Sequence, residues 1–209
     1  MEQGSAEWLQ ARLGRVTASR VADVMAKTKT GPSASRTNYF AQLLCERLTG
    51  NPTECFVNDA MRWGVEREPE ARAAYSFRHD VDVTEIAFVN HPTIAMAGAS
   101  PDGLIGSDGL LEIKCPNTAT HLDTLASGSI PGKYQIQMTW QLACCQRDWC
   151  DFVSWEPRLP EHLRMFVKRF HRDELREAET EAEVTAFLAE LDARIEDLNT
   201  RYGAKMKAA

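Results

Sequence analysis

Asp102, Glu112 and Lys114 stand close together in the stretch SPDGLIGSDGLLEIKCP, residues 100–116. Asp102 precedes Glu112 by ten residues, and Lys114 follows at i+2, the spacing at which two side chains share one face of a strand. The leucines and isoleucines between them predict a hairpin whose opposite face packs in a core. A three-residue turn at 107–109 is expected, with Gly109 at positive φ, which pairs residue 104 with 112 and residue 102 with 114. All three charged side chains then lie on one face.

Two carboxylates that face each other repel unless a cation lies between them. Oxygen ligands with few protein donors suit Mg²⁺, or Mn²⁺ in its place, because these ions keep waters and take substrate oxygens as further ligands. A lysine beside such a site can orient a water and stabilise charge on a phosphate. The pattern therefore predicts metal-assisted phosphodiester hydrolysis. The alternative is an exposed strand face that carries an ordinary ion pair.

The length of 209 residues suits a single domain with a full core. The sequence has no long apolar run and no secretory leader, so we expect no membrane span and a cytoplasmic location. Its six cysteines form no C-x-x-C pair and are interpreted as reduced, mostly buried thiols, with a cysteine-ligated iron–sulfur cluster as the alternative. They are Cys45, Cys55, Cys115, Cys144, Cys145 and Cys150.

The charge is divided unevenly along the chain. Residues 173–197 hold ten acids and two arginines, a net of −8, whereas the rest of the chain sums to +2. Residues 12–36 carry six basic residues against one acid. Because a polyanion responds to the local field, the total of −6 does not exclude DNA as a partner. For each charged run alone, a solvated surface is the alternative.

Apolar spacing predicts several helices and strands around the hairpin. Residues 26–38 are polar and basic and predict a mobile loop. Pro69 should kink or break the helix that begins near Asn58, at about Glu68. Helices are expected after Ser5, after Thr17 or Ser19, from Asn38 to Gly50, from Asn58 toward Phe77, over 133–146 and over 172–202; strands are expected over 82–89, 93–99, 150–156 and 163–170. We expect one α/β domain over 1–209, a central mixed sheet flanked by helices.

Four blocks of the sequence resemble the family of phage lambda exonuclease and the YqaJ-like viral recombinases, within the PD-(D/E)xK nuclease superfamily. They are EQGSAEWLQARLGRVTAS, AMRWGVEREPEAR, SPDG…LEIKCP and YQIQ, which occur in the family's order and together span most of the chain. The resemblance implies the restriction-endonuclease-like fold. It also implies a Mg²⁺-dependent enzyme that degrades one strand of duplex DNA from its 5′ end, with two ions per site.

The resemblance also implies roles for individual residues. Asp102 and Glu112 would bind metal together with the Ile113 carbonyl, and Lys114 would be the catalytic lysine. Glu68 matches the helical acid that completes the site, although the neighbouring Pro69 departs from the pattern and leaves Glu66 and Glu70 as alternatives. Four positions match a pocket for the terminal 5′-phosphate: Arg12, Ser19, Ser100 and Gln135.

Met61 matches an apolar wedge against the duplex end; from its spacing alone it would be helix core. The resemblance further implies DNA ends as substrate, a ring-shaped homotrimer, a single-strand annealing protein as partner, and a phage or prophage origin. In such a ring the basic segment 12–36 would line the hole while the acidic 172–202 helix faces away. Two other functions remain open: an endonuclease with the same metal core, and a non-catalytic module that binds DNA ends.

Overall fold

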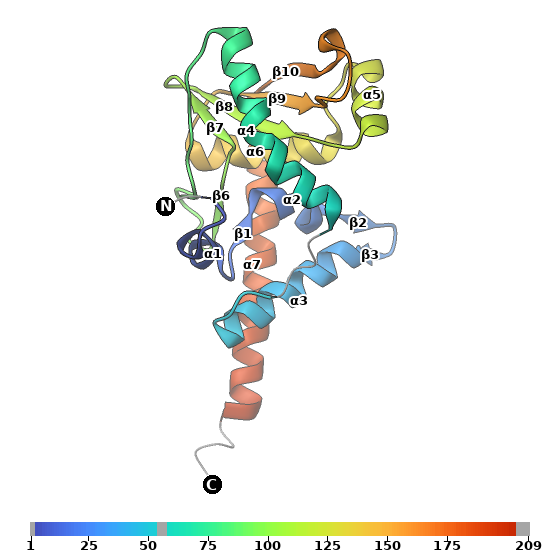
Figure 1. Cartoon of the computed structure of the whole chain (residues 1–209). Coiled ribbons are helices and arrows are strands. Elements are labelled where there is room, and N and C mark those ends of the chain that lie inside the picture. Colours follow the sequence, from blue (N-terminus) through green and yellow to red (C-terminus); the bar gives the residue numbers. More distant parts are fainter. Residues whose placement is uncertain (1–2, 54–57, 204–209) are drawn as a thin grey trace.

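A five-stranded mixed sheet carries the acid-bearing hairpin, with its strands in the order β10–β9–β8–β7–β4. Its first four strands, β10 to β7, can be followed in Figure 1. The computed structural model describes residues 3–53 and 58–203. The strands are β4 (Val83–Thr84), β7 (Gly103–Ile105), β8 (Gly109–Lys114), β9 (Trp149–Trp155) and β10 (Met165–His171). Neighbours run antiparallel except for β8 and β9, which are parallel. The prediction of a mixed sheet is confirmed.

Alternation along β8 divides its residues between the two faces of this sheet. Leu111 and Ile113 pack against Ala71 and Tyr75 of helix α4 (Asp59–His79). Leu110, on the opposite face, belongs to a second cluster beneath α6 (Gly132–Cys145). Glu112 falls on this α6 face, because successive strand residues point to opposite sides.

A second layer is built from the N-terminal segment and the C-terminal helix. It contains a three-stranded sheet, β1–β6–β5, and a core that reaches across to α6 through Trp140. Its elements are α1 (Ala6–Arg12), β1 (Val16–Thr17), α2 (Ala18–Met25), α3 (Ala34–Thr49), β5 (Val89–Asn90), β6 (Ala97–Ala99) and α7 (Glu174–Gly203), while α5 (Thr118–Ser127) and a short 3₁₀ helix (Glu161–Leu163) follow the sheet strands. The far end of α7 projects beyond the rest of the protein (Figure 1).

Helix α6 lies between the two layers and is buried on every side from Gln137 to Cys144. Met138 and Leu142 join the sheet cluster, whereas Trp140 and Cys144 join the N-terminal one. A helix that is apolar all round is expected at such a position. Two of its buried polar residues, Gln137 and Gln141, carry amides and are therefore candidates for a specific role.

The prediction of a loop over residues 26–38 is wrong. The segment forms a hairpin, β2 (Lys27–Thr28) with β3 (Gly31–Pro32), and then the first turn of α3. Helix α3 begins at Ala34 because the Ser33 hydroxyl accepts the Arg36 backbone N–H at 3.1 Å, which satisfies an otherwise unpaired donor. A polar composition therefore concealed a capping residue.

Of the two outcomes expected at Pro69, the break is excluded, because α4 is one helix from Asp59 to His79, while the kink stays a prediction. Proline removes the single hydrogen bond to the carbonyl of Val65. The Val65 side chain is 73% exposed, so this turn faces water, which can bond to that carbonyl. The lost hydrogen bond is thus tolerated at this position.

Other expectations fare better. Ser5 and Asn58 cap α1 and α4, the predicted 133–146 helix is α6, and the acidic tail forms α7. The strands expected over 82–89 and 93–99 are shorter than predicted, as β4, β5 and β6 show. Within the described ranges, no helix combines the length and the apolar character needed to cross a bilayer.

Candidate active site

The turn of the β7–β8 hairpin differs from the predicted one. Leu104 lies opposite Leu110, and the turn occupies residues 106–108 with Gly106 at φ 54°. The predicted pairing of residue 104 with 112 is therefore wrong, as is the positive φ expected at Gly109. The register differs by two residues, and a shift of two leaves every side chain on the same face.

Continuing this register by one residue places Asp102 across from Glu112. The Asp102 side chain is 9% exposed, and its Oδ2 accepts the backbone N–H of Ile113 at 2.6 Å. This bond orients the carboxylate and leaves Oδ1 for another ligand. Burial, followed by the charge of Glu112, raises the pKa of Asp102 well above its usual value. The two carboxylates are therefore close enough to oppose each other's ionisation.

Glu112 is fully buried and is held from both sides by α6. Gln137 Nε2 donates to Oε1 at 2.7 Å, and Gln141 Nε2 donates to Oε2 at 2.6 Å. Lys114 Nζ forms an ion pair with Oε1. A buried carboxylate needs such donors, because an unpaired charge in a low dielectric is costly. The two amides and the ammonium fix Glu112 in one orientation.

Lys114 lies between the acids and an aromatic ring. Its ammonium is 5.3 Å from the ring centroid of Tyr134, and its side chain is 27% exposed. Burial alone would lower the pKa of Lys114, but the charges of Glu112 and Asp102 outweigh it and raise the pKa above its usual value. The lysine is thus a cation at neutral pH.

Helix α4 brings Glu68 to the same place. Burial is the main cause that raises the pKa of Glu68, and the charge of Glu112 also raises it. Glu66 is exposed, and Glu70 is engaged with Arg67 at 3.3 Å on the surface. Of the three acids that the sequence left open, Glu68 is the one that the structure places beside the hairpin.

Arg72, one helical turn after Glu68, bonds to two parts of the site. Its Nη2 donates to Glu68 Oε1 at 2.5 Å, and its Nε donates to the backbone carbonyl of Asp102 at 3.1 Å. Its Nη1 lies 2.8 Å from Glu85 Oε1. The guanidinium therefore joins α4 to the beginning of the acid-bearing hairpin.

Two of the four predicted phosphate-pocket residues meet. Arg12 Nη1 lies 3.5 Å from Ser100 Oγ, and the Arg12 guanidinium stacks on the Trp8 ring, 3.9 Å from its centroid. Trp8 Nε1 also donates to Ser100 Oγ at 2.9 Å. Because both neighbours donate to this oxygen, the Ser100 proton is left for an acceptor such as phosphate.

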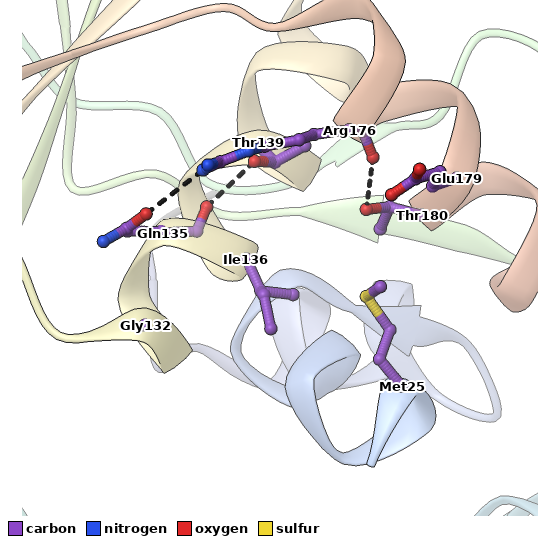
Figure 2. A pocket seen from close by; sticks show the side chains of 8 residues that line it. All are labelled: Met25, Gly132, Gln135, Ile136, Thr139, Arg176, Glu179 and Thr180. Carbon is purple, nitrogen blue, oxygen red and sulfur yellow. Dashed lines mark hydrogen bonds between the residues drawn. The ribbon is translucent and has the colours of Figure 1, made fainter. Parts of the chain in front are cut away.

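Ser19 and Gln135 make other contacts. Ser19 is exposed in the first turn of α2, which packs on α6. Gln135 lines a cavity of about 230 Å³ between α2, α6 and α7, where its Oε1 accepts from Arg176 at 3.1 Å (Figure 2). Its Nε2 donates to the Ile130 carbonyl at 2.8 Å. Asp102, Glu112 and Lys114 do not line this cavity. The phosphate role of the four residues stays a prediction.

Several other predicted residues can also be placed. Met61 is 50% exposed, so its spacing-based assignment to helix core is wrong and its wedge role stays a prediction. The arrangement of the basic segment and the acidic helix in a ring stays a prediction, but two basic residues of that segment contact the acidic helix. Lys27 and Arg36 form ion pairs with Glu183 and Glu190 of α7.

The cysteines that the structure describes are all free thiols. Three are buried, Cys145 is partly buried and Cys45 is exposed, whereas Cys55 lies outside the described residues. Burial raises the pKa of Cys115 and of Cys145 to about 12, so both remain protonated at neutral pH. In the described part of the chain, no three His, Cys, Asp or Glu side chains converge in an arrangement ready to hold an ion.

Four side chains of the site were missed by the sequence reasoning. They are Trp8, Arg72, Gln137 and Gln141. The i,i+4 spacing of Glu68 and Arg72 is a visible signal for a helical ion pair. The i,i+4 spacing of Gln137 and Gln141 likewise puts two amides on one face of the predicted helix. Nothing in the sequence indicates that Trp8 would contact Ser100.

The sequence of this chain matches a known protein family. A model of the YqaJ-like viral recombinase domain matches residues 7–148, more than half of the chain. The chain belongs to the YqaJ-like viral recombinase family. The matched region includes the acid-bearing hairpin and all of α6, so the family assignment predicted from the sequence is confirmed.

Solved structures agree with this YqaJ-like assignment. An alkaline exonuclease from Laribacter hongkongensis, LHK-Exo, is 53% identical to the chain; the match covers 97% of this chain and 100% of that one with a TM-score of 0.90. The same enzyme in complex with dAMP gives 0.91. A phage-related exonuclease from Haemophilus somnus 129PT, 14% identical over 88% of this chain and 96% of its own, has a TM-score of 0.70 and shares the fold. The predicted fold, a single mixed α/β domain of PD-(D/E)xK type, is confirmed.

One curated relative is a viral protein without a described activity. The uncharacterized protein R354 of Acanthamoeba polyphaga mimivirus is 28% identical over an alignment of 170 positions that covers 73% of this chain. The match spans 29% of that relative's length.

Proposed function

We propose that this protein is a divalent-metal-dependent exonuclease that degrades one strand of linear double-stranded DNA from its 5′ end and leaves a 3′ single-stranded overhang. The observation that carries this proposal is the buried pair of Asp102 and Glu112 beside the charged Lys114. The family of this chain and its 53% identity to an alkaline exonuclease support a nuclease activity of this kind.

The donor set fits a hard cation such as Mg²⁺, with Mn²⁺ as a substitute. Asp102 Oδ1 and Glu112 Oε2 are anionic oxygens that can each donate a lone pair to a metal ion. We propose the Ile113 carbonyl and the Glu68 carboxylate as further donors. Together these groups would hold two ions per site. Mg²⁺ uses one or two carboxylates and keeps positions for water and phosphate.

The residues around the proposed metal site have distinct tasks. A bound metal would supply an activated water and neutralise charge on the phosphate. Gln137 and Gln141 hold Glu112 so that its carboxylate does not rotate away from the ion. Lys114 is charged and lies near the Tyr134 ring; it would orient a water or donate to a phosphate oxygen.

Recognition of the 5′ end would come from the Trp8–Arg12–Ser100 cluster. A terminal phosphate carries more charge than an internal one, and a planar guanidinium can bind two of its oxygens. Stacking on Trp8 pre-orients the Arg12 guanidinium, and the free proton of Ser100 adds a donor. Ser100 lies two residues before Asp102, so a phosphate bound there would stand close to the proposed metal ligands.

Assembly and partners belong to the same proposal. The family description as a recombinase supports a role in strand annealing after resection, with a single-strand annealing protein that binds the overhang. We also propose a homotrimeric ring around the duplex. Because Lys27 and Arg36 are already paired with α7, a ring would draw its positive lining from residues such as Arg15, which bonds to the neutral Asn90 and Ala95.

The test is digestion of a linear duplex and of a covalently closed circle with Mg²⁺ and with chelator. The proposal predicts loss of the linear DNA only, with Mg²⁺ only, and no loss with Asp102→Asn. Cleavage of the circle would instead establish an endonuclease. Binding of DNA ends without any digestion would establish a non-catalytic module.

A further inference from the structure

Arg72 contacts the two halves of the candidate active site through one guanidinium. Three of its nitrogens are used: Nη2 on Glu68 Oε1 at 2.5 Å, Nε on the Asp102 carbonyl at 3.1 Å and Nη1 on Glu85 Oε1 at 2.8 Å. The side chain is 12% exposed, although an unpaired arginine belongs at the surface. Its burial is therefore explained by these contacts.

The partners differ in how much they can contribute. Glu85 is 68% exposed, and an ion pair at that exposure contributes little. Glu68 is 28% exposed, and the Asp102 carbonyl belongs to the first acid itself, directly before β7. The geometry of Arg72 therefore matters for Glu68 and Asp102 more than for Glu85.

Packing of α4 does not by itself fix where Glu68 points. The helix meets the sheet through Ala71 and Tyr75, on the face opposite to Glu112. A glutamate beyond that contact has three rotatable bonds. The guanidinium is a rigid planar fork, so a carboxylate and a carbonyl that bind two of its N–H groups are held at a set separation.

We propose that Arg72 is a positioning residue: it holds the Glu68 carboxylate at a fixed place relative to Asp102, and so presents a third acidic donor to the metal. The proposal rests on the proposed metal-dependent nuclease function. Groups that orient metal ligands typically change metal affinity or activity by about 10- to 100-fold when they are replaced. An arginine that only staples α4 to the hairpin would instead change stability and leave metal affinity alone.

Arg72→Lys is the main variant, because lysine keeps the charge but cannot bind two partners as a fork. The matched control is Glu85→Gln, which removes the charge of the exposed partner of the same guanidinium. Mn²⁺ binding is measured by calorimetry without DNA, and the Mg²⁺ dependence of digestion and the thermal midpoint are measured alongside. We expect Arg72→Lys to weaken Mn²⁺ binding by about 10- to 100-fold and to shift half-maximal activation to higher Mg²⁺ by a similar factor. Glu85→Gln should stay within about twofold of the wild type, since its pair is exposed.

A double variant tests whether Arg72 acts through Glu68. Residues that act as one unit are not additive, so Arg72→Lys with Glu68→Gln should bind Mn²⁺ as Glu68→Gln alone does. Arg72→Gln, shorter and uncharged, is a second single variant and should lose at least as much affinity as Arg72→Lys.

Three results would overturn the inference. Wild-type Mn²⁺ affinity in both Arg72 variants, together with a lowered thermal midpoint, would show that Arg72 only stabilises the contact between α4 and the hairpin. Additive losses in the double variant would show that it does not act through Glu68. A wild-type protein that neither binds Mn²⁺ nor digests DNA would overturn the proposed function as well, which separates that failure from the first two.

Discussion

Replacing Lys114 by methionine should destabilise the metal-free protein, because the ammonium is the positive partner of a fully buried carboxylate. Glu112 is 0% exposed and pairs with Lys114 Nζ. Removing one member of a buried ion pair typically costs about 3–5 kcal/mol, since the remaining charge is left uncompensated. Two features reduce that cost here: Gln137 and Gln141 continue to donate to Glu112, and water reaches a Lys114 side chain that is 27% exposed.

We therefore expect the free energy of unfolding to fall by roughly 2–3 kcal/mol. For a chain of this length that corresponds to a thermal midpoint lower by roughly 4–12 °C. The assay is urea unfolding at pH 8 with chelator present. Lys168→Met is the control, because Lys168 is exposed on β10 and donates only to the backbone carbonyl of Gly128 among the described contacts.

Adding Glu112→Gln to Lys114→Met should restore most of the lost stability, since no buried charge then remains. The catalytic rate of Lys114→Met should fall on the order of 10² or more, as for other positioned proton-transfer or electrostatic groups. Wild-type stability of Lys114→Met, or a double variant as unstable as the single one, would refute the pairing of Lys114 with Glu112.

Three further predictions follow from the same structure. Arg12→Ala should slow digestion of 5′-phosphorylated ends about 10- to 150-fold more than digestion of 5′-hydroxyl ends, measured at one salt concentration. This factor corresponds to the loss of a charge-assisted contact of roughly 1.5–3 kcal/mol. An equal loss on both kinds of end would show that Arg12 does not bind the terminal phosphate. Asp102→Asn should abolish digestion yet stabilise the metal-free protein at pH 7–8. Because the folded pKa of Asp102 is raised, the wild type loses stability as pH rises above the ordinary value of 3.8, and calorimetric scans of the variant should lack that loss. A double-mutant cycle of Arg36→Met and Glu190→Gln should give a coupling below about 1 kcal/mol, because Glu190 is 55% exposed; a larger value would mean that α7 is clamped electrostatically.

Sequence periodicity was sufficient to predict the face that carries the acids, although the hairpin register was wrong. The alternation of side chains along a strand has a period of two, so a register wrong by two residues still puts Asp102 and Glu112 together. The choice of turn is less visible, because Gly106 and Gly109 are both free to adopt a positive φ. The structure uses Gly106.

Features that depend on one side chain or on distant contacts were harder to predict. The Ser33 cap that starts α3 lies in a polar segment whose composition is typical of a loop. The pairing of Lys27 with Glu183 joins residues 156 positions apart, which no local pattern indicates. The contacts of Trp8 and Arg72 are of the same kind, since each joins a helix to a strand end that is remote in sequence.

Polarity of digestion tests the central claim most directly. A linear duplex with a 5′-phosphate on both strands, labelled at the 5′ end in one sample and at the 3′ end in another, is digested with Mg²⁺ and sampled at short times. We predict that the 5′ label is released at once as a mononucleotide while the 3′ label stays on long strands, and that Asp102→Asn releases neither. Early release of the 3′ label, or release that continues in chelator, would contradict a metal-dependent 5′-to-3′ exonuclease.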